Sequence, residues 1–361
     1  MSYFNLDGKR TVTISLTIEE KSKKEQEWRQ YLESIPQYPR NRFYGRGIVI
    51  CGGGLKYFTC AWVCIKRLRE IGCQLPIEVW HDSSELTEGC ITNLRELGNV
   101  TCQDFSKFGL NDLKGYMYKP FSILYSDFEE VLSLDADNIC VFDPEDLFDL
   151  EIYKTNGALF WPDFWETPSD NPIWGIMGIP FIEMKEQESG QILVNKQKSW
   201  EALHLCTYLN KEEKFYYELL HGDKDTFRFA WLALEKPFGF IRNEPGICGY
   251  FDKNSFFLGN TIVQYDNNYV PYFLHRNLLK WESTIDKKLK WRAVKRFEKA
   301  KKKGYLIKYS ESEGHFFLDF VGDYKIHDFR NVFGELEESC LNSLVELRNM
   351  EFYKEFKSSS T

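Results

Sequence analysis

Short apolar runs alternate with amphipathic segments along the middle of the chain. Residues 48–51 are an apolar run between two glycines, and residues 77–80 are mostly apolar and lie between Pro76 and His81, which predicts two buried strands. Residues 56–71, between these runs, carry apolar side chains at helical spacing. A strand, helix, strand unit favours a parallel sheet, and ligands of such sheets bind at the carboxyl ends of the strands.

The pattern continues downstream. It predicts a third strand at 101–105, a helix at 116–126, a strand that starts at 131, a helix at 199–209 and short strands between 238 and 274. We therefore predict an α/β fold in which a mostly parallel central sheet is flanked by helices.

The two ends of the chain differ from its middle. Residues 17–34 predict a helix that precedes a proline-containing linker. Residues 280–308 hold twelve Lys and Arg against three acidic residues. This run predicts a solvated helix face, with an anionic acceptor or a membrane surface as the alternative partner. Residues 331–357 predict one amphipathic helix.

These changes divide the chain into three parts. Residues 1–44 form an N-terminal helical extension and linker, and residues 281–361 form a basic and helical C-terminal extension. Residues 45–280 form one domain, with halves at 45–150 and 151–280.

Composition narrows the class of protein. The net charge of −8 argues against a general nucleic-acid binder. Ten cysteines without a Cys-x-x-Cys pair favour a reducing, cytoplasmic location. No apolar run reaches the roughly 20 residues that span a bilayer, and no signal peptide is recognisable. A Golgi lumenal location after loss of an anchor is the alternative, and the sequon at Asn99 is compatible with it.

The chemistry of the chain is concentrated in the segment Leu134-Asp-Ala-Asp-Asn138. Side chains at i and i+2 of an extended segment point to the same side, so Asp135 and Asp137 face one site. Two carboxylates suit Mg²⁺ or Mn²⁺ and leave coordination positions for phosphate oxygens. A turn after a strand also favours Asp and Asn, so the tripeptide alone is a weak signal.

A glycine triplet follows the first predicted strand. Gly52, Gly53 and Gly54 allow close approach of the backbone to a nucleotide, and they present amide hydrogens at a helix start. A tight strand-to-helix turn explains them equally well. Their spacing matches neither a dinucleotide fingerprint nor a P-loop. His81 ends the second strand and is a further candidate for contact with a nucleotide. A polar cap on a helix that begins near Ser84 explains this residue equally well.

Four motifs stand in a recognisable order. They are Cys51-Gly-Gly-Gly-Leu55, Tyr118-Lys-Pro-Phe-Ser-Ile-Leu124 with Leu134-Asp-Ala-Asp-Asn138, Glu188-Ser-Gly-Gln191, and Gly222-Asp-Lys-Asp-Thr-Phe-Arg228. Over about residues 45–280 the chain resembles the fungal-type α-mannosyltransferase family, in particular its Golgi α-1,3-mannosyltransferases. The resemblance implies the GT-A fold of nucleotide-sugar glycosyltransferases and a retaining, metal-dependent transfer. It also implies that residues 45–280 are the catalytic domain, with the donor half at 45–150 and the acceptor half at 151–280.

The resemblance also implies roles for the donor-binding residues. Asp137 would bind Mn²⁺ or Mg²⁺ directly, with His275 as a further ligand. Asp135 would contact the metal, a metal-bound water or the ribose. Lys119 and Lys280 would share the charge of the diphosphate.

The sugar-binding residues follow from the later motifs. Asp223 and Asp225 would bind sugar hydroxyls or stabilise the reacting centre, and Glu188, Gly190 and Gln191 would line the same pocket. A helix N-cap is the structural alternative for Asp225. Retention is compatible with a same-face displacement, or with two displacements through a carboxylate such as Glu188 or Asp223.

The expected reaction moves mannose from GDP-mannose to a glycan acceptor in α linkage. A UDP-sugar donor carrying glucose, galactose or N-acetylglucosamine is the alternative. A phosphohydrolase would place more carboxylate and His ligands close together than this chain does. A sugar-binding module without activity would not need the carboxylates.

Overall fold

The computed structural model describes residues 2–285, 288–311 and 313–360. The chain forms two compact units. Unit 1 holds the residues up to Val49, Asp112–Ser133 and Leu147–Ile241. Unit 2 holds Ile50–Asn111, Leu134–Asp146 and the residues from Arg242 onward.

Unit 1 is built on strands in the order β10-β8-β9-β6-β3. The strand β10 pairs with β8 in parallel, whereas β8 and β9 are antiparallel. Strands β3 and β6 each begin in unit 1 and end in unit 2. Their bounds are β3 Arg46–Cys51, β6 Glu130–Asp135, β8 Ala158–Glu166, β9 Lys185–Asn195 and β10 Gly239–Phe240.

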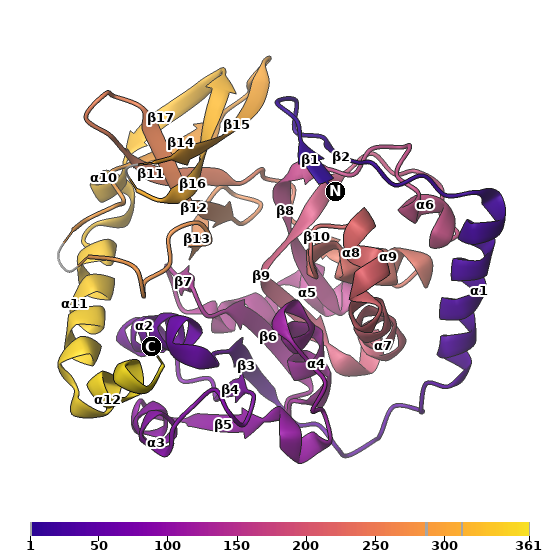
Figure 1. Ribbon diagram of the computed structural model, residues 1–361, viewed down its shortest axis with the longest axis horizontal. Helices are drawn as coiled ribbons and strands as arrows, with labels where there is room; N and C mark the ends of the chain where they lie inside the picture. Colours follow the sequence, from indigo (N-terminus) through magenta and orange to yellow (C-terminus); the bar gives the residue numbers. More distant parts are fainter. Residues whose placement is uncertain (1, 286–287, 312, 361) are drawn as a thin grey trace. The chain divides into compact units, whose positions relative to one another are not determined.

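Helices pack against these strands, with α7 beside α9 and α1 beside α7 (Figure 1). The predicted helix at 17–34 is confirmed as α1, which begins with a capping box between Thr17 and Glu20. Trp28 anchors α1, because its buried indole donates to the carbonyl of Ile176 at 2.8 Å. The bounds are α1 Ile18–Glu33, α4 Tyr118–Tyr125, α5 Glu151–Asn156, α6 Ile173–Ile176, α7 Lys196–Lys211, α8 Glu213–Leu219 and α9 Lys224–Ala233.

An N-terminal β-hairpin precedes α1 and also belongs to unit 1. Strands β1 (Ser2–Phe4) and β2 (Arg10–Val12) pair antiparallel. Gly8 adopts φ +86° in the turn between them, a conformation that suits glycine. The sequence pattern did not predict this hairpin, because three-residue strands are too short to show an alternation.

Unit 2 continues the strand and helix pattern. After β3 come α2 (Gly54–Glu70), β4 (Ile77–His81), α3 (Glu88–Glu96) and β5 (Val100–Asp104), and β4 pairs with β5 in parallel. These elements confirm the strands and the helix predicted from the apolar runs. Short 3₁₀ helices occupy Phe105–Phe108, Gly115–Met117 and Pro144–Asp149.

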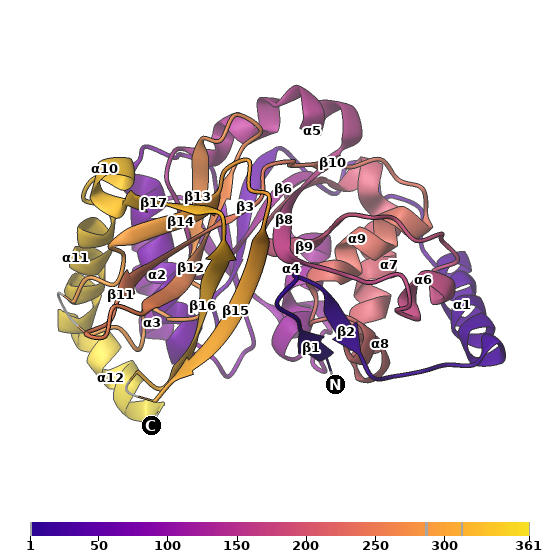
Figure 2. The ribbon, with the colours of Figure 1, turned by 90° about the horizontal axis from the view of Figure 1, so that it is seen from above.

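The rest of unit 2 includes an eight-stranded antiparallel sheet, whose strands β11 to β17 are shown in orange and yellow in Figure 2. Its strand order is β15-β16-β12-β11-β14-β17, and β13 pairs with both β12 and β7. The bounds are β7 Asn138–Cys140, β11 Gly246–Phe251, β12 Phe257–Tyr265, β13 Pro271–His275, β14 Ala293–Phe297, β15 Lys303–Ser310, β16 His315–Gly322 and β17 Tyr324–Asp328.

Two predictions for the C-terminal part are wrong. The basic segment 280–308, of which 286–287 lie outside the described residues, forms β14 and the first part of β15 instead of a helix. Its buried aromatic residues Phe297 and Tyr305 favour a strand over a helix. The single helix predicted at 331–357 is three helices, α10 (Phe329–Phe333), α11 (Leu336–Asn349) and α12 (Glu351–Ser359). Breaks at Gly334, with φ +61°, and at Met350, in an extended conformation, separate them.

The α/β class predicted from the sequence is confirmed, and α11 packs along α2 within unit 2 (Figure 1). None of the ten cysteines, all of which lie among the described residues, forms a disulfide bond, and nine of them are buried. None of the described helices has the length and apolar character needed to cross a membrane.

Candidate functional site

The carboxyl end of β6 holds the two aspartates predicted to bind a metal. Val131, Leu132 and Leu134 are buried and fix the strand. Asp135 is its last residue, with a side chain that is 28% exposed, and Asp137 follows with a side chain that is 2% exposed. The strand end therefore places one partly exposed and one buried carboxylate two residues apart.

Pairing between strands brings His275 to these aspartates. His275 ends β13, which pairs antiparallel with β7, and it lies opposite Asn138 in the register. The backbone N–H of Arg276 donates to the carbonyl of Asp137 at 3.0 Å. As a result the Nε2 atom of His275 lies 3.3 Å from Oδ1 of Asp137 and 3.5 Å from Oδ2 of Asp135.

Lys280 completes this group, because its ammonium forms an ion pair with Oδ2 of Asp137. Burial would raise the pKa of Asp137, but Lys280 and His275 lower it well below its ordinary value. Burial likewise opposes the charge of Lys280, but Asp137 raises the pKa of Lys280 above its ordinary value. Both groups are therefore charged at neutral pH.

The donor set fits a divalent cation. Asp135, Asp137 and His275 each offer one ligand atom, and these atoms lie within 4.8 Å of one another. Carboxylate oxygens with one imidazole nitrogen suit Mn²⁺ and Mg²⁺. The nearby Cys60 is a poor ligand, since burial raises the pKa of its thiol to about 12 and keeps it protonated.

The glycine triplet forms the turn between β3 and α2. Gly54 adopts φ +69°, and a Cβ atom on Gly53 would lie 1.8 Å from Oε2 of Glu85. The N–H groups of Gly52 and Gly54 donate to the carbonyls of Trp80 and Glu85 at 3.0 and 3.2 Å. The triplet thus allows close approach of the backbone, while two of its three amides are already engaged.

His81 ends β4 and is buried in unit 2. Its Nδ1 atom lies 2.8 Å from the carbonyl oxygen of Asp82. No helix begins near Ser84, since α3 starts at Glu88 with Thr87 as its N-cap. The structure thus removes helix capping near Ser84 as an explanation for His81.

Lys119 and Asp223 meet in unit 1. The ammonium of Lys119 lies 3.1 Å from Oδ2 of Asp223. It also donates to the hydroxyl and the carbonyl of Ser189 at 2.8 and 2.9 Å. The Ser189 hydroxyl lies 3.3 Å from the same Asp223 oxygen. A residue of α4, one of β9 and the N-cap of α9 therefore form one polar cluster.

The remaining predicted sugar-binding residues lie on β9 beside this cluster. Glu188 and Gln191 are buried, and Glu188 accepts from the N–H of Gly190 at 2.9 Å. Residues 187–191 are thus a strand whose charged and amide side chains lie in the interior of unit 1.

Asp225 lies inside a buried network of charges. It is the second residue of α9 and makes no capping bond, so the N-cap alternative is wrong. Its Oδ1 atom lies 2.9 Å from Nε of Arg228 and accepts from the N–H of Gln187 at 3.1 Å. Its Oδ2 atom lies 3.0 Å from Nζ of Lys224. Asp225 therefore holds α9 against β9.

Sequence reasoning missed five charged members of this network. They are Arg10, Asp163, Glu186, Lys224 and Arg228, all at least nine-tenths buried. Among them only Asp163 had a sequence signal, since it is a charged residue within the aromatic run Phe160-Trp-Pro-Asp-Phe-Trp165.

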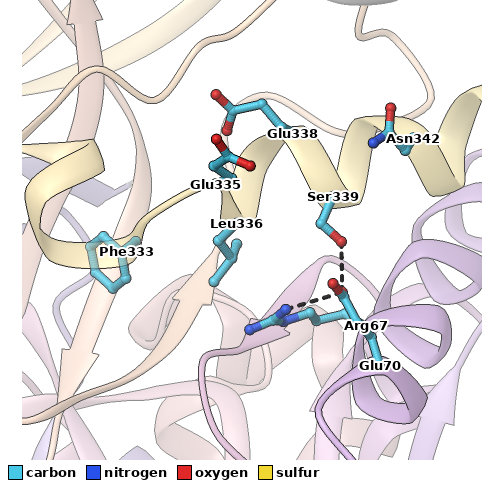
Figure 3. A pocket seen from close by; sticks show the side chains of 8 residues that line it. All are labelled: Arg67, Glu70, Phe333, Glu335, Leu336, Glu338, Ser339 and Asn342. Carbon is cyan, nitrogen blue, oxygen red and sulfur yellow. Dashed lines mark hydrogen bonds and ion pairs between the residues drawn. The ribbon is translucent and has the colours of Figure 1, made fainter.

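A hollow of about 410 Å³ lies elsewhere in unit 2, between the C-terminal part of α2 and the start of α11. Figure 3 shows Glu70 in this hollow, where its carboxylate accepts from Ser339 at 2.6 Å and from Arg67 at 3.0 Å. None of the predicted site residues lines it, and we assign it no role.

Comparison with known families identifies the chain. The profile of a family described as "Mannosyltransferase putative" matches residues 45–184 and 181–266. The chain belongs to this mannosyltransferase family. The matched region contains every predicted site residue except His275 and Lys280.

Curated relatives of the family are similar over part of their length. The alpha-1,2-mannosyltransferase MNN21 of Candida albicans is 29% identical over 62% of this chain and 43% of its own length. The alpha-1,2-mannosyltransferase MNN2 of Saccharomyces cerevisiae is 29% identical over 66% of this chain and 48% of its own length. The chain thus spans about half the length of these relatives, whose names specify α-1,2 linkages where the sequence resemblance pointed to α-1,3 members.

Solved structures of glycosyltransferases also resemble the chain. The galactosyltransferase LgtC, in complex with donor and acceptor sugar analogues, is 16% identical over 55% of this chain and 73% of its own length, with a TM-score of 0.38. The glycosyltransferase GlyE of Streptococcus pneumoniae TIGR4 is 16% identical over 55% of this chain and 45% of its own, also with a TM-score of 0.38.

Proposed function

We propose that this protein transfers mannose from GDP-mannose to a glycan acceptor and forms an α linkage with retention at the anomeric carbon. The observation that carries the proposal is the group of Asp135, Asp137 and His275 in a chain of the mannosyltransferase family. We propose that residues 45–280 are the catalytic domain and that residues 1–44 and 281–361 are extensions of it.

The donor diphosphate binds at the aspartates. Asp135, Asp137 and His275 would hold Mn²⁺ or Mg²⁺, which when bound would offset the charge of the diphosphate and of the departing nucleotide. Lys280, already beside Asp137, supplies a further positive charge to the leaving group. The backbone at Gly52–Gly54 and the His81 side chain border the nucleoside.

The mannose binds at the polar cluster that Lys119, Ser189 and Asp223 form in unit 1. Asp223 accepts hydrogen bonds from sugar hydroxyls or faces the anomeric carbon, and Lys119 holds this carboxylate in place through their ion pair. Glu188, Gly190 and Gln191 line the same pocket. Asp225, whose oxygens already bind Lys224, Arg228 and Gln187, positions α9 and with it Asp223.

The configuration at the anomeric carbon is retained by one of two routes. In the first, the acceptor hydroxyl attacks from the face that the nucleotide leaves, and its proton passes to an oxygen of the departing diphosphate. In the second, the carboxylate of Asp223 or Glu188 forms a glycosyl ester that the acceptor then displaces. Trapping of a mannosylated Asp223 or Glu188 would establish the second route.

A thermal-shift screen tests donor and metal together, because a ligand of the native state raises its stability. GDP-mannose, GDP and UDP-sugars are compared with and without Mn²⁺, on the native sequence, on Asp137→Ala and on Asp146→Ala. Asp146 is exposed and belongs to the same unit, which makes it the matched control.

We expect a Mn²⁺-dependent shift with guanosine nucleotides that Asp137→Ala loses and Asp146→Ala keeps. A shift with UDP-sugars alone would indicate that the donor is a UDP-sugar instead of GDP-mannose. No shift with any nucleotide would count against a transferase.

A product assay separates transfer from hydrolysis. GDP-mannose is incubated with α-mannosides, and the new linkage is read by proton NMR. We expect an α-linked product whose amount depends on acceptor. Free mannose in equal amount with and without acceptor would indicate a hydrolase.

A further inference from the structure

The N-terminal hairpin β1–β2 is attached to the core of unit 1. The N–H of Glu166, at the end of β8, donates to the carbonyl of Gly8 at 2.8 Å. The ring of Phe4 packs 4.6 Å from Trp165 and 4.9 Å from His221. The hairpin lies outside the residues that the family profile matches, so its role is not implied by family membership.

Arg10 is the residue that the hairpin inserts into the core. Its side chain is fully buried, a state that an arginine adopts only with partners. Its Nε atom donates to Oε1 of Glu186 at 2.8 Å, and its Nη1 atom donates to the carbonyl of Leu219 at 3.1 Å. These two bonds link the hairpin to β9 and to the end of α8.

The contacts of Arg10 lead to the proposed sugar-binding residues. Glu186 also forms an ion pair with Lys224, through its other carboxylate oxygen. Lys224 lies 2.9 Å from Oδ2 of Asp163 and 3.0 Å from Oδ2 of Asp225. Lys224 directly follows Asp223 at the start of α9. Only Glu186 and Lys224 therefore separate Arg10 from the carboxylate assigned to the sugar.

Arg10 balances the charge of this network. The cations are Arg10, Lys224 and Arg228, and the anions are Asp163, Glu186 and Asp225. Without Arg10 the network would hold three anions and two cations in a region that excludes water. Lys224 would then be the main counter-charge of Glu186 and would be drawn away from Asp163 and Asp225.

We propose that Arg10 is a positioning residue of the transfer reaction: it neutralises Glu186, so that Lys224 remains shared with Asp163 and Asp225 and holds the start of α9 and Asp223 in place. The inference rests on the proposed function. It makes the N-terminal hairpin a part of the sugar-binding half, whereas the sequence placed it in an extension.

Four variants of the full chain test the charge link. Arg10→Met removes the positive charge. Arg10→Lys keeps the charge but lacks the guanidinium group that bonds Glu186 through one nitrogen and the Leu219 carbonyl through another. Arg10→Met combined with Glu186→Gln removes one cation and one anion and restores the balance. Phe4→Ala weakens the docking of the hairpin and leaves every charge in place, so it controls for lost stability.

For Arg10→Met we expect kcat to fall about 100-fold, the size of effect that a small misplacement of reacting groups produces, with less than a threefold change in KM for GDP-mannose. Arg10→Lys and the double variant should each regain at least about tenfold over Arg10→Met. Phe4→Ala should keep kcat within about threefold of the native value. Native kcat in Arg10→Met, or a double variant no better than the single one, would overturn the inference.

A measurement independent of turnover keeps the inference separate from the proposed function. Burial would raise the pKa of Glu186, but Lys224, Arg10 and Arg228 lower it below its ordinary value. The stability that Glu186 contributes is present above the ordinary pKa of a glutamate and is lost as pH falls. Arg10→Met should bring the folded-state pKa of Glu186 back toward its ordinary value, so this variant should be less stable than the native chain at neutral pH but lose less thermal stability on acidification.

If the thermal stability of Arg10→Met depended on pH in the same way as that of the native chain, this result would contradict the charge link even if transfer occurs. A native chain that transfers no mannose would defeat the proposed function and leave the acid profile as the test of Arg10.

Discussion

Lys280 and Asp137 form an ion pair at the position where a divalent cation would bind, with the imidazole of His275 3.3 Å from the other oxygen of the same carboxylate. The ammonium and a metal ion therefore compete for one side of Asp137. When a diphosphate is also bound, the Lys280 ammonium can form an ion pair with the diphosphate instead of with Asp137.

Lys280→Met should consequently change the affinities for metal and nucleotide in opposite directions. Mn²⁺ alone should bind about three- to tenfold more tightly, because one competing positive charge is gone. GDP in the presence of Mn²⁺ should bind more weakly by a similar factor. Electron paramagnetic resonance of free Mn²⁺ measures the first affinity, and calorimetry measures the second.

Lys66→Met serves as the control, since it removes a partly exposed cation of the same unit that pairs with Glu346. Weaker Mn²⁺ binding in Lys280→Met would instead mean that the lysine orients Asp137 for the metal.

Asp223→Asn should separate binding from turnover. The amide keeps the size of the side chain but removes the charge that Lys119 faces at 3.1 Å. We expect kcat to fall by about 10²- to 10³-fold, as when one electrostatic contact to a transition state is removed, with donor affinity nearly unchanged. Steady-state kinetics and thermal shift with GDP-mannose measure the two quantities, and full activity would refute a role in the reaction.

Asp225→Asn should act mainly on stability. It leaves Lys224 and Arg228 buried without the carboxylate that now lies within 3.0 Å of both. Breaking a buried pair of this kind costs about 3–5 kcal/mol. Urea unfolding followed by tryptophan fluorescence should show this loss. Asp149→Asn, which affects a mostly exposed pair with Arg46 in the same unit, should cost about 1 kcal/mol or less.

His204 should make unit 1 sensitive to mild acid. It lies in α7 against Trp200, and burial lowers its pKa to about 4. An unfolded histidine titrates near pH 6.5. Between these values the unfolded chain binds the extra proton, so stability is complete above about pH 6.5 and falls as pH drops toward 4.

The loss should be on the order of 1–2 kcal/mol, because the side chain keeps partial contact with solvent. Thermal unfolding at pH 7.5 and pH 5 measures it. His204→Phe should flatten this dependence, whereas His315→Gln, on the first residue of β16, should leave it unchanged. If the stability of His204→Phe depended on pH as strongly as that of the native chain, other titrating groups would be responsible for the loss of stability in acid.

The donor half could be predicted from the sequence because its signals are local. An apolar run fixes β6, and the strand geometry then places Asp135 and Asp137 together. Lys119 and Asp223 could be named as site residues only through the family motifs, since their mutual contact depends on the packing of α4 against β9 and α9.

Long-range pairing could not be predicted in the same way. His275 reaches the aspartates because β13 pairs with β7, and nothing in either segment specifies that partner. The basic segment after Lys280 was assigned to a helix from its charge, although its buried aromatic residues belong to a sheet. Arg10 gave no signal, because its partner Glu186 lies 176 residues away.

That separation also has a consequence for how the protein is made. During synthesis from the N-terminus, the hairpin leaves the ribosome well before β9 and α8, so Arg10 has no Glu186 and no Leu219 carbonyl to bind. Closing so long a loop comes after local structure has formed. The attachment of the hairpin is therefore a late event in folding, and the nascent chain carries an arginine without these partners until β9 and α8 have been translated.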